Sequence, residues 1–327
     1  MGVRPPAVVT EQSPARNERA AWARQVAQAP RPRHEVATGG SRPARSVAAA
    51  VACALLLGGC EQATDRPAPA ERTSPTATPS PPVSAPSSSA PEPAYSTWER
   101  GAHPLPLRSD GLGQIGPTPP SLRERRYPTV DVLPPPGDGR FHGSVEPVTP
   151  EIARRSTWRA GCPVRLDALR YVTVSFRGFD GGAHTGELLV AARAASRVVS
   201  VFRALYAADF PIEEMRLPTI QDLQAHPTGD GNNTAAFVCR PTVGASASWS
   251  AHAYGLAIDV NPFMNPYSRG AVVLPELASS YLRRGWRRPG MIGPDSVAVR
   301  EFARIGWSWG GRWRGLKDYQ HFTATGR

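Results

Sequence analysis

Apolar residues are concentrated in the second half of the chain, where their spacing predicts strands and helices. YVTVSF, residues 171–176, alternates apolar and polar side chains as a half-buried strand does. From residue 186 to residue 207 apolar side chains recur at helical spacing, which predicts one amphipathic helix. Residues 296–305 predict a second, short helix. Further short strands are predicted at residues 235–240, 255–260 and 321–325. Because strands and helices do not alternate strictly, we expect an α+β fold.

The first half of the chain is rich in proline and poor in aliphatic residues. We assign residues 61–125 to a disordered Pro/Ser/Thr-rich linker, because such a segment cannot bury enough apolar surface to offset its ordering entropy. Its clearest part is an extended tether from Glu61 to about Tyr95. Residues 96–150 include scattered large apolar side chains, so we expect irregular chain packed against the domain there, and we assign residues 126–160 to an irregular segment that packs on the domain. The domain itself is predicted to span residues 161–327.

A targeting segment precedes this linker. Between Arg45 and Cys60 the sequence reads RSVAAAVACALLLGGC, an apolar run of about 14 residues behind a positive flank. This length fits a signal-peptide core, whereas a membrane span needs about 20 residues. The end of the run resembles a bacterial lipobox, so we expect residues 1–60 to be an N-terminal extension with a lipoprotein-type signal peptide, and Cys60 to be lipidated. An ordinary signal peptide with an incidental cysteine is the alternative.

The targeting segment sets the expected compartment. We expect an exported, extracytoplasmic protein, anchored to the membrane by lipid on Cys60 or, alternatively, secreted. Two cysteines remain after the signal segment, Cys162 and Cys239. In an oxidising compartment such a pair predicts a disulfide, and two buried free thiols are the alternative.

The formal net charge of +11 raises the question of nucleic-acid binding. Eight arginines and three glutamates lie within residues 1–45, so much of the positive excess precedes any folded segment. No basic stripe interleaved with aromatic residues follows it, and we therefore expect no nucleic-acid partner.

Candidate metal ligands gather in WSAHAYGLAID, residues 249–259. Asp259 lies within an apolar run, and a buried carboxylate there needs a cation or several hydrogen-bond donors. His252 offers an imidazole nearby, and His321 follows Asp318 by three positions. Two histidines and one carboxylate suit a catalytic zinc ion, which keeps one position open for water. Asp318 is placed to accept a proton from that water.

Two longer stretches resemble a known family. SWSAHAYGLAIDVNPFMNPY matches the Ser-x-His-x-x-Gly-x-Ala-x-Asp signature of the zinc D-alanyl-D-alanine carboxypeptidases and L-alanyl-D-glutamate endopeptidases, whose fold is shared with the hedgehog signalling domain. GWSWGGRWRGLKDYQHF resembles the closing motif of the same family. The resemblance covers about residues 160–325 and implies a small antiparallel sheet with flanking helices, together with one zinc ion.

The resemblance also implies roles for single residues. It makes Asp318 the general base, and it makes Arg240 a residue that binds substrate and polarises the scissile carbonyl. A plain structural ion pair is the alternative for Arg240. Ser250 is expected to orient a ligand or the substrate. The implied zinc ligands are His252, Asp259 and His321.

Other conspicuous residues have less specific patterns. The tryptophans of the closing motif could line a groove for peptide or glycan, or could belong to the core, and we assign Trp309 to the substrate. We expect His184 to be structural and Asn232 and Asn233 to lie in a turn. The tryptophans in question are Trp307, Trp309 and Trp313.

Together these features predict a monomeric zinc metallopeptidase that hydrolyses peptidoglycan stem peptides in the manner of a D-alanyl-D-alanine carboxypeptidase. One alternative is L-alanyl-D-glutamate endopeptidase specificity. Another is a non-catalytic, zinc-containing module that binds the cell wall, although a structural zinc is usually closed by a fourth protein ligand. A hydrolase with Ser250 as nucleophile is disfavoured, because no strand-to-helix nucleophile elbow surrounds that serine.

Overall fold

A computed structural model describes residues 94–243 and 248–326 of the 327-residue chain. The predicted signal segment, the lipidation site at Cys60 and the tether up to residue 93 lie outside these residues. Within the described part of the chain, no helix is both long and apolar enough to cross a membrane.

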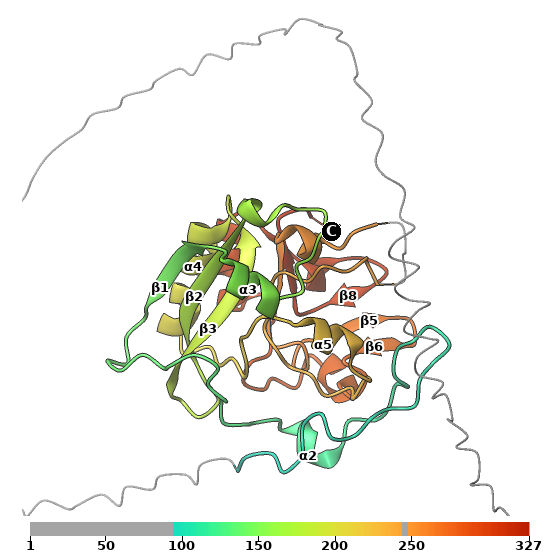
Figure 1. Cartoon of the computed structure of the whole chain (residues 1–327). Helices are drawn as coiled ribbons and strands as arrows, with labels where there is room; N and C mark the ends of the chain where they lie inside the picture. Colours follow the sequence, from blue (N-terminus) through green and yellow to red (C-terminus); the bar gives the residue numbers. More distant parts are fainter. Residues whose placement is uncertain (1–93, 244–247, 327) are drawn as a thin grey trace, which may run out of the picture. The chain divides into compact units, whose positions relative to one another are not determined.

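The described residues form three three-stranded sheets with antiparallel pairings (Figure 1). The first contains β1 (Gly143–Pro147), β2 (Leu169–Arg177) and β3 (Ala183–Ala191), in that order. The second has the order β4-β9-β7, with bounds Ala257–Asp259, His321–Thr323 and Ser308–Trp309. The third has the order β6-β5-β8, with bounds Val272–Leu274, Tyr267–Arg269 and Lys317–Asp318. The expected mixture of helices with small antiparallel sheets is confirmed, but the strands form three sheets instead of one.

The helices are short. They are α2 (Pro120–Arg123), α3 (Pro150–Arg155), α4 (Ala195–Ala207), α5 (Ile220–Gln224) and α6 (Val297–Arg304). Single 3-10 turns lie at η1 (Leu166–Ala168), η2 (Ala251–Tyr254), η3 (Ser279–Leu282) and η4 (Gly310–Arg312). The main core joins the first two sheets, since Val174 of β2, Phe202 of α4 and Phe322 of β9 belong to one buried cluster. This cluster fixes the second sheet, which carries two of the candidate metal ligands, against the rest of the domain.

One predicted helix proves to be a strand followed by a helix. Residues 183–191 form β3, and α4 begins only at Ala195, so the prediction of a single helix over 186–207 is wrong. Residues Gly186 to Ala191 of β3 are all buried, so its apolar side chains face both ways and lose the alternation typical of a half-buried strand. Residues 235–240 are likewise not a strand of any sheet; Ala235 makes only an isolated bridge to Asp259. The predictions at 171–176, 255–260, 296–305 and 321–325 are confirmed by β2, β4, α6 and β9.

Residues 94–131, which we call the N-terminal strap, pack along the domain. The assignment of residues up to 125 to a disordered linker is therefore wrong from residue 94 onward. Trp98 Nε1 donates a hydrogen bond to Asp230 Oδ2 at 2.8 Å, and Leu122 is fully buried in a second core cluster with Phe263. A few large apolar residues between the prolines thus bury enough surface to order the strap.

The buried carboxylate of Glu213 forms ion pairs with two arginines of the strap. Arg125 donates two hydrogen bonds to it, from Nε and Nη2, both at 2.7 Å, and Arg100 Nη1 lies 3.2 Å from Oε1. Asn232 Nδ2 donates to Oε2 at 2.8 Å. The side chains of Arg125 and Glu213 are 1% and 0% exposed. Removal of one partner would leave a charge buried with fewer partners, so this contact should carry much of the strap's stability.

We predict that Arg125→Ala lowers the free energy of unfolding by about 3–5 kcal/mol, because Glu213 would lose its bidentate partner inside the protein. Urea unfolding followed by tryptophan fluorescence measures the loss. Arg123→Ala is the matched control, since Arg123 is exposed in the same segment, and a change within about 0.5 kcal/mol is expected there. Equal stability of the two variants would contradict the role given to Glu213.

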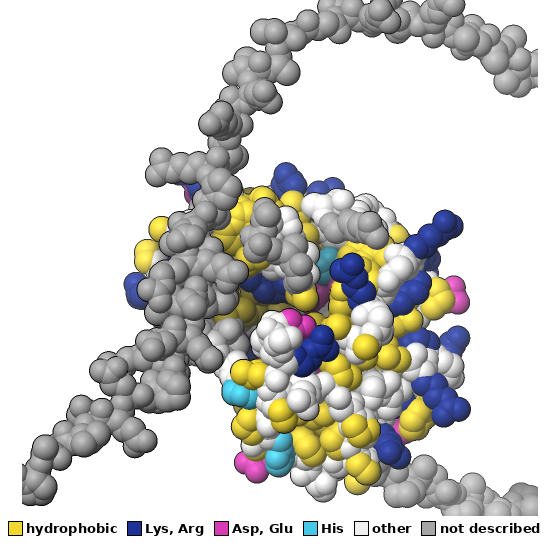
Figure 2. Space-filling model, turned by 90° about the vertical axis from the view of Figure 1, so that its right-hand side faces the viewer, with side chains coloured by type: hydrophobic (Ala, Val, Ile, Leu, Met, Phe, Trp, Pro, Cys, Tyr) yellow, Lys and Arg dark blue, Asp and Glu magenta, His cyan; other side chains and the backbone are white. Residues whose placement is uncertain are grey.

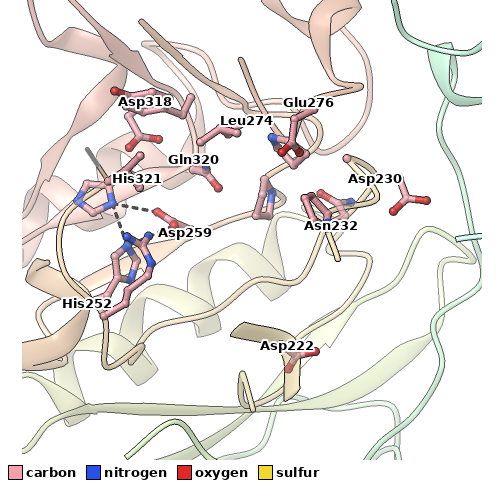
Figure 3. A pocket seen from close by; sticks show the side chains of 18 of the residues that line it. Asp222, Asp230, Asn232, His252, Asp259, Leu274, Glu276, Asp318, Gln320 and His321 are labelled. Atoms are coloured by element: carbon pink, nitrogen blue, oxygen red, sulfur yellow. Dashed lines mark hydrogen bonds and ion pairs between the residues drawn. The ribbon is translucent and has the colours of Figure 1, made fainter. Parts of the chain in front are cut away.

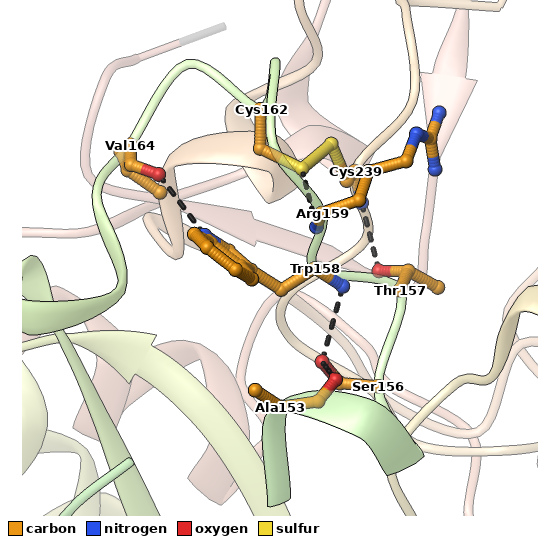
Figure 4. The surroundings of a disulfide bond; sticks show 8 residues. All are labelled: Ala153, Ser156, Thr157, Trp158, Arg159, Cys162, Val164 and Cys239. Carbon is orange, nitrogen blue, oxygen red and sulfur yellow. Dashed lines mark hydrogen bonds between the residues drawn. A yellow bond between two sulfur atoms is a disulfide. The ribbon is translucent and has the colours of Figure 1, made fainter. Parts of the chain in front are cut away.

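A disulfide joins Cys162 to Cys239, two residues 77 positions apart (Figure 4). Cys239 is fully buried, and its backbone N–H donates to Thr157 Oγ1 at 2.9 Å. The backbone N–H of Arg159 donates to Cys162 Sγ at 3.3 Å. Because Cys239 directly precedes Arg240, the bond fixes the main chain next to one of the candidate site residues.

Candidate metal centre and substrate cavity

Two strands and one turn bring the three candidate ligands together. In the pairing of β4 with β9, Asp259 lies directly opposite His321, so the two side chains share one face of the sheet. His252 comes from the turn η2, just before β4. One ligand atom from each residue lies within 4.8 Å of the others (Figure 3). The ligand set predicted from the sequence is thus assembled in space.

The donor atoms converge on a single point. His321 Nδ1 lies 2.9 Å from Asp259 Oδ1, while His252 Nε2 lies 3.1 Å from His321 Nδ1 and 3.2 Å from Asp259 Oδ2. His252 Nδ1 donates to the Ala236 carbonyl oxygen at 2.6 Å, which leaves Nε2 free to bind a cation. Two imidazoles and one carboxylate are the ligand types of catalytic zinc sites, so the cluster fits a metal ion. No fourth His, Cys, Asp or Glu joins it among the described residues.

The local sequence explains the position of His252. Ser250 precedes η2, and its Oγ accepts a hydrogen bond from the backbone N–H of His252 at 3.3 Å. Gly255 ends the turn with a φ of 64°, and a Cβ there would lie 2.6 Å from the backbone nitrogen of Ala191. The serine and glycine of the Ser-x-His-x-x-Gly motif therefore shape the turn that presents the histidine. Ser250 also lines the cavity described below.

The charge of Asp259 is stabilised by its neighbours. Burial alone would raise the pKa of its carboxyl, but His252 and His321 outweigh that effect and hold the pKa well below its usual range. The carboxylate is therefore ionised and available as a ligand across the physiological pH range.

The carboxyl of Asp318, unlike that of Asp259, has a raised pKa. It lies on β8, and its Oδ1 is buried with no hydrogen-bond partner in the described part of the chain. Burial raises the pKa of Asp318 to about 7; His321 opposes this rise, and the charge of Asp259 adds to it. A Cβ at Gly310 would lie 2.9 Å from that of Asp318, so the closing motif needs glycine there. A buried carboxyl with a pKa near neutrality is typical of a general base or acid.

Arg240 and one tryptophan of the closing motif line the cavity, whereas another tryptophan belongs to the core. Arg240 lines the cavity, and its charge lowers the pKa of Asp318. Trp309 does not line the cavity: it is 7% exposed in the main core, and its Nε1 donates to the Tyr319 carbonyl oxygen at 2.8 Å. Its assignment to the substrate is therefore wrong, because β7 turns this side chain inward. Trp313 lines the cavity instead, with its ring centroid 5.3 Å from that of His321.

Two other residues have structural roles. His184 lies between two carboxylates, with Nδ1 2.9 Å from Asp131 Oδ1 and Nε2 3.0 Å from Asp180 Oδ1. Asn232 is 2% exposed, and its Oδ1 accepts from the backbone N–H of Phe263 at 2.8 Å. Asn232 is thus a buried connection between segments as well as a loop residue, which its sequence neighbourhood does not indicate.

The candidate ligands and Asp318 open into one cavity of about 1090 Å³. Its walls also include Arg240 and Ser250 near the cluster, residues 225–232 and 274–276 farther away, and Arg100 and Arg125 of the strap. On the face shown in Figure 2, Lys and Arg side chains are interspersed with apolar and polar ones and form no continuous stripe. A cavity of this size can accommodate several residues of a peptide.

Residues 243–324 match a family model described as D-alanyl-D-alanine carboxypeptidase. No curated protein and no solved structure matches the chain. The matched segment contains the three candidate ligands and Asp318, while Arg240 and the N-terminal strap lie outside it. The resemblance to this family is confirmed over that segment, and it indicates peptidase activity in general.

We predict that Asp318 makes the metal-free protein less stable as the pH rises. Its pKa is about 7 in the folded state and 3.8 in its ordinary environment, so folding favours the protonated form. The resulting stability is full below about pH 4 and is lost as the pH passes through about 7, by up to about 4 kcal/mol. Urea unfolding of chelator-treated protein at several pH values measures this slope. The slope should be weaker in Asp318→Asn, and parallel curves for the two proteins would contradict the assignment.

Proposed function

We propose that this protein is a zinc-dependent peptidase that hydrolyses stem peptides of peptidoglycan, with D-alanyl-D-alanine carboxypeptidase-like action. The observation that carries the proposal is the cluster of His252, Asp259 and His321 beside Asp318, whose buried carboxylate oxygen has no partner in the described residues. A structural zinc would usually have a fourth protein ligand. Three ligands next to a carboxyl with a pKa of about 7 suit catalysis better than structure.

The proposed mechanism assigns proton transfer to Asp318. Zinc, when bound by the three ligands, supplies a Lewis acid that makes water more acidic and polarises the scissile carbonyl. Asp318 accepts the proton of the attacking water and returns it to the leaving amine. Its unpaired Oδ1 is free for this hydrogen bond, and burial, which raises the pKa of the carboxyl in the metal-free protein, favours the uptake of a proton.

Arg240 is proposed to hold the substrate. Its guanidinium lines the same cavity as Asp318, with Nη1 donating to the Pro241 carbonyl oxygen at 3.1 Å. The remaining N–H groups can stabilise a developing oxyanion or bind a substrate carboxylate. The disulfide at Cys239 holds the main chain beside this arginine, so the guanidinium starts from a fixed position. Ser250 contributes by supporting the turn that carries His252.

The proposal also includes the substrate of the enzyme and its location. The family description names D-alanyl-D-alanine carboxypeptidase, which supports peptidoglycan peptides as substrates. L-alanyl-D-glutamate endopeptidase specificity is the alternative within the same chemistry. The run RSVAAAVACALLLGGC supports export and a lipid anchor on Cys60, with secretion as the alternative. We further propose that the protein acts as a monomer and without a nucleic-acid partner.

The test is cleavage of purified peptidoglycan by the exported chain, with the products identified by mass spectrometry. We expect release of terminal D-alanine that stops with a chelator and returns with zinc. Asp318→Asn should lower the rate by about 10²–10⁴-fold while still binding zinc, because the metal ligands are untouched. Asp295→Asn is the matched control, since Asp295 is exposed and distant in sequence from the ligands, and its activity should equal that of the wild type.

Three results would change the proposal. Cleavage that survives complete removal of metal, or full activity of Asp318→Asn, would contradict the mechanism. Release of L-alanyl-D-glutamate cleavage products would assign the endopeptidase specificity. A protein that binds zinc and cell wall but cuts no bond would support the non-catalytic binding module.

A further inference from the structure

The cavity wall away from the metal ligands contains a carboxylate without a cationic partner. Glu276 is 6% exposed, and the only hydrogen bond to its side chain in the described part of the chain comes from the backbone N–H of Gly113 to Oε1, at 2.8 Å. Two other carboxylates that line the same cavity, Glu214 and Asp222, are both paired with Arg216. Asp230 has no ion pair either, but both of its oxygens accept hydrogen bonds. Glu276 therefore differs from these three carboxylates, and resembles Asp318, in having an oxygen with no hydrogen-bond partner among the described residues.

The N-terminal strap holds Glu276 in this position. Besides the bond from Gly113, the backbone N–H of Gly116 donates to the Glu276 carbonyl oxygen at 3.3 Å. Thr118 Oγ1 donates to the carbonyl oxygen of the next residue, Leu277, at 2.6 Å. A Cβ at Gly113 would lie 3.0 Å from Glu276 Oε1, so glycine permits the close approach. The carboxylate is thus fixed by a defined set of contacts and is not a freely moving surface group.

A nearly buried carboxylate is unfavourable unless a cation or several donors accompany it. Glu276 has one donor, and no ion pair to it is formed within the described residues. In Figure 3, Glu276 lies in the same pocket as Asp318 and His321, with Leu274 between them. A substrate that extends from the metal ligands along this wall would reach Glu276 and could supply the missing cation.

The geometry narrows the chemistry of that cation. One oxygen of Glu276 already accepts the Gly113 N–H, so a guanidinium that bound both oxygens would have to share that oxygen with it. An ammonium group is a compact point charge that needs only one oxygen. A metal ion is disfavoured, because Glu276 belongs to no group of three potential ligands in the described part of the chain.

We infer that Glu276 binds a side-chain ammonium of the peptide, so that the enzyme prefers substrates with a diamino acid residue to one side of the scissile bond. This inference rests on the proposed peptidase function and adds a specificity residue to it. The strap then acts as part of the substrate site, because it positions the carboxylate.

The test uses the zinc-loaded wild-type chain and peptides in which a single lysine is moved along the sequence on either side of the cleaved bond. Each is compared with the same peptide carrying norleucine, which has a similar length and no ammonium. At one position, norleucine should lower kcat/KM about tenfold or more, chiefly through KM. Glu276→Gln should remove this preference, so that the ratio of kcat/KM for the lysine and norleucine peptides approaches one. Glutamine keeps the size of glutamate and can still accept from Gly113, and thermal unfolding checks that the variant is folded.

Glu214→Gln is the matched control, because Glu214 Oε1 lies 2.5 Å from Arg216 Nε and is already paired; this variant should keep the preference for lysine. Equal use of lysine and norleucine at every position by the wild type would overturn the inference, as would an unchanged preference in Glu276→Gln. If the wild type cuts no peptide, the proposed function fails separately. Calorimetric binding of the two peptides then decides the role of Glu276, and equal affinities would refute it.

Discussion

The structure is organised by the cost of removing a carboxylate from water. Four of the carboxylates in and around the cavity are accommodated in four different ways. Glu213 is paired with the guanidinium of Arg125, and Asp259 lies within 3.2 Å of two imidazoles. Asp318 has neither and responds with a raised pKa. Glu276 has one backbone donor and no cation in the described residues. The first arrangement stabilises the fold, whereas Asp259 and Asp318 belong to the proposed catalytic site and Glu276 to the proposed substrate-binding wall.

Different parts of the chain hold the cavity wall and the candidate metal ligands in place. Glu213 and the strap lie on the side of the cavity away from the metal ligands and fix the wall that includes Asn232. Asp259 and His321 are fixed by the pairing of β4 with β9, a contact that the main core supports through Phe322. The cavity therefore lies between a rigid sheet and a wall that an ion pair holds in place. Its two ends depend on different interactions, and Asn261 connects them, because its Oδ1 accepts from the backbone N–H of Glu213 at 3.2 Å.

Local motifs allowed the metal cluster to be predicted from the sequence. His252 and Asp259 lie within eight residues of each other, and an aspartate inside an apolar run is informative because it must be compensated. The strand β3 could not be recognised, since burial on both faces removes the alternation on which such a prediction depends. Trp309 and Trp313 could not be distinguished either. Their inward and outward directions are set by the two-residue strand β7 and the turn η4, which are too short to show a periodicity.

The strap was missed for a related reason. Its contacts, such as Trp98 with Asp230 and Arg125 with Glu213, join residues 132 and 88 positions apart. A proline-rich composition gives no sign of such partners, because composition describes the segment alone. The proposed role of Glu276 was hidden in the same way, since its unusual feature is the absence of a cationic partner among the described residues, which becomes visible only when its neighbours are known.

The arrangement of the cavity also bears on how such a domain can be exchanged between proteins. The segment 243–324 contains the three candidate ligands and Asp318, but it does not contain the whole cavity wall. Arg240, its neighbouring disulfide and the strap that positions Glu276 all precede it in the chain. Recombination at the borders of that segment would transfer the metal cluster without residues 225–232 and the strap residues of the cavity wall. A unit inherited with the proposed selectivity would therefore have to include Gly113 and Thr118 of the strap, more than 120 residues before the matched segment.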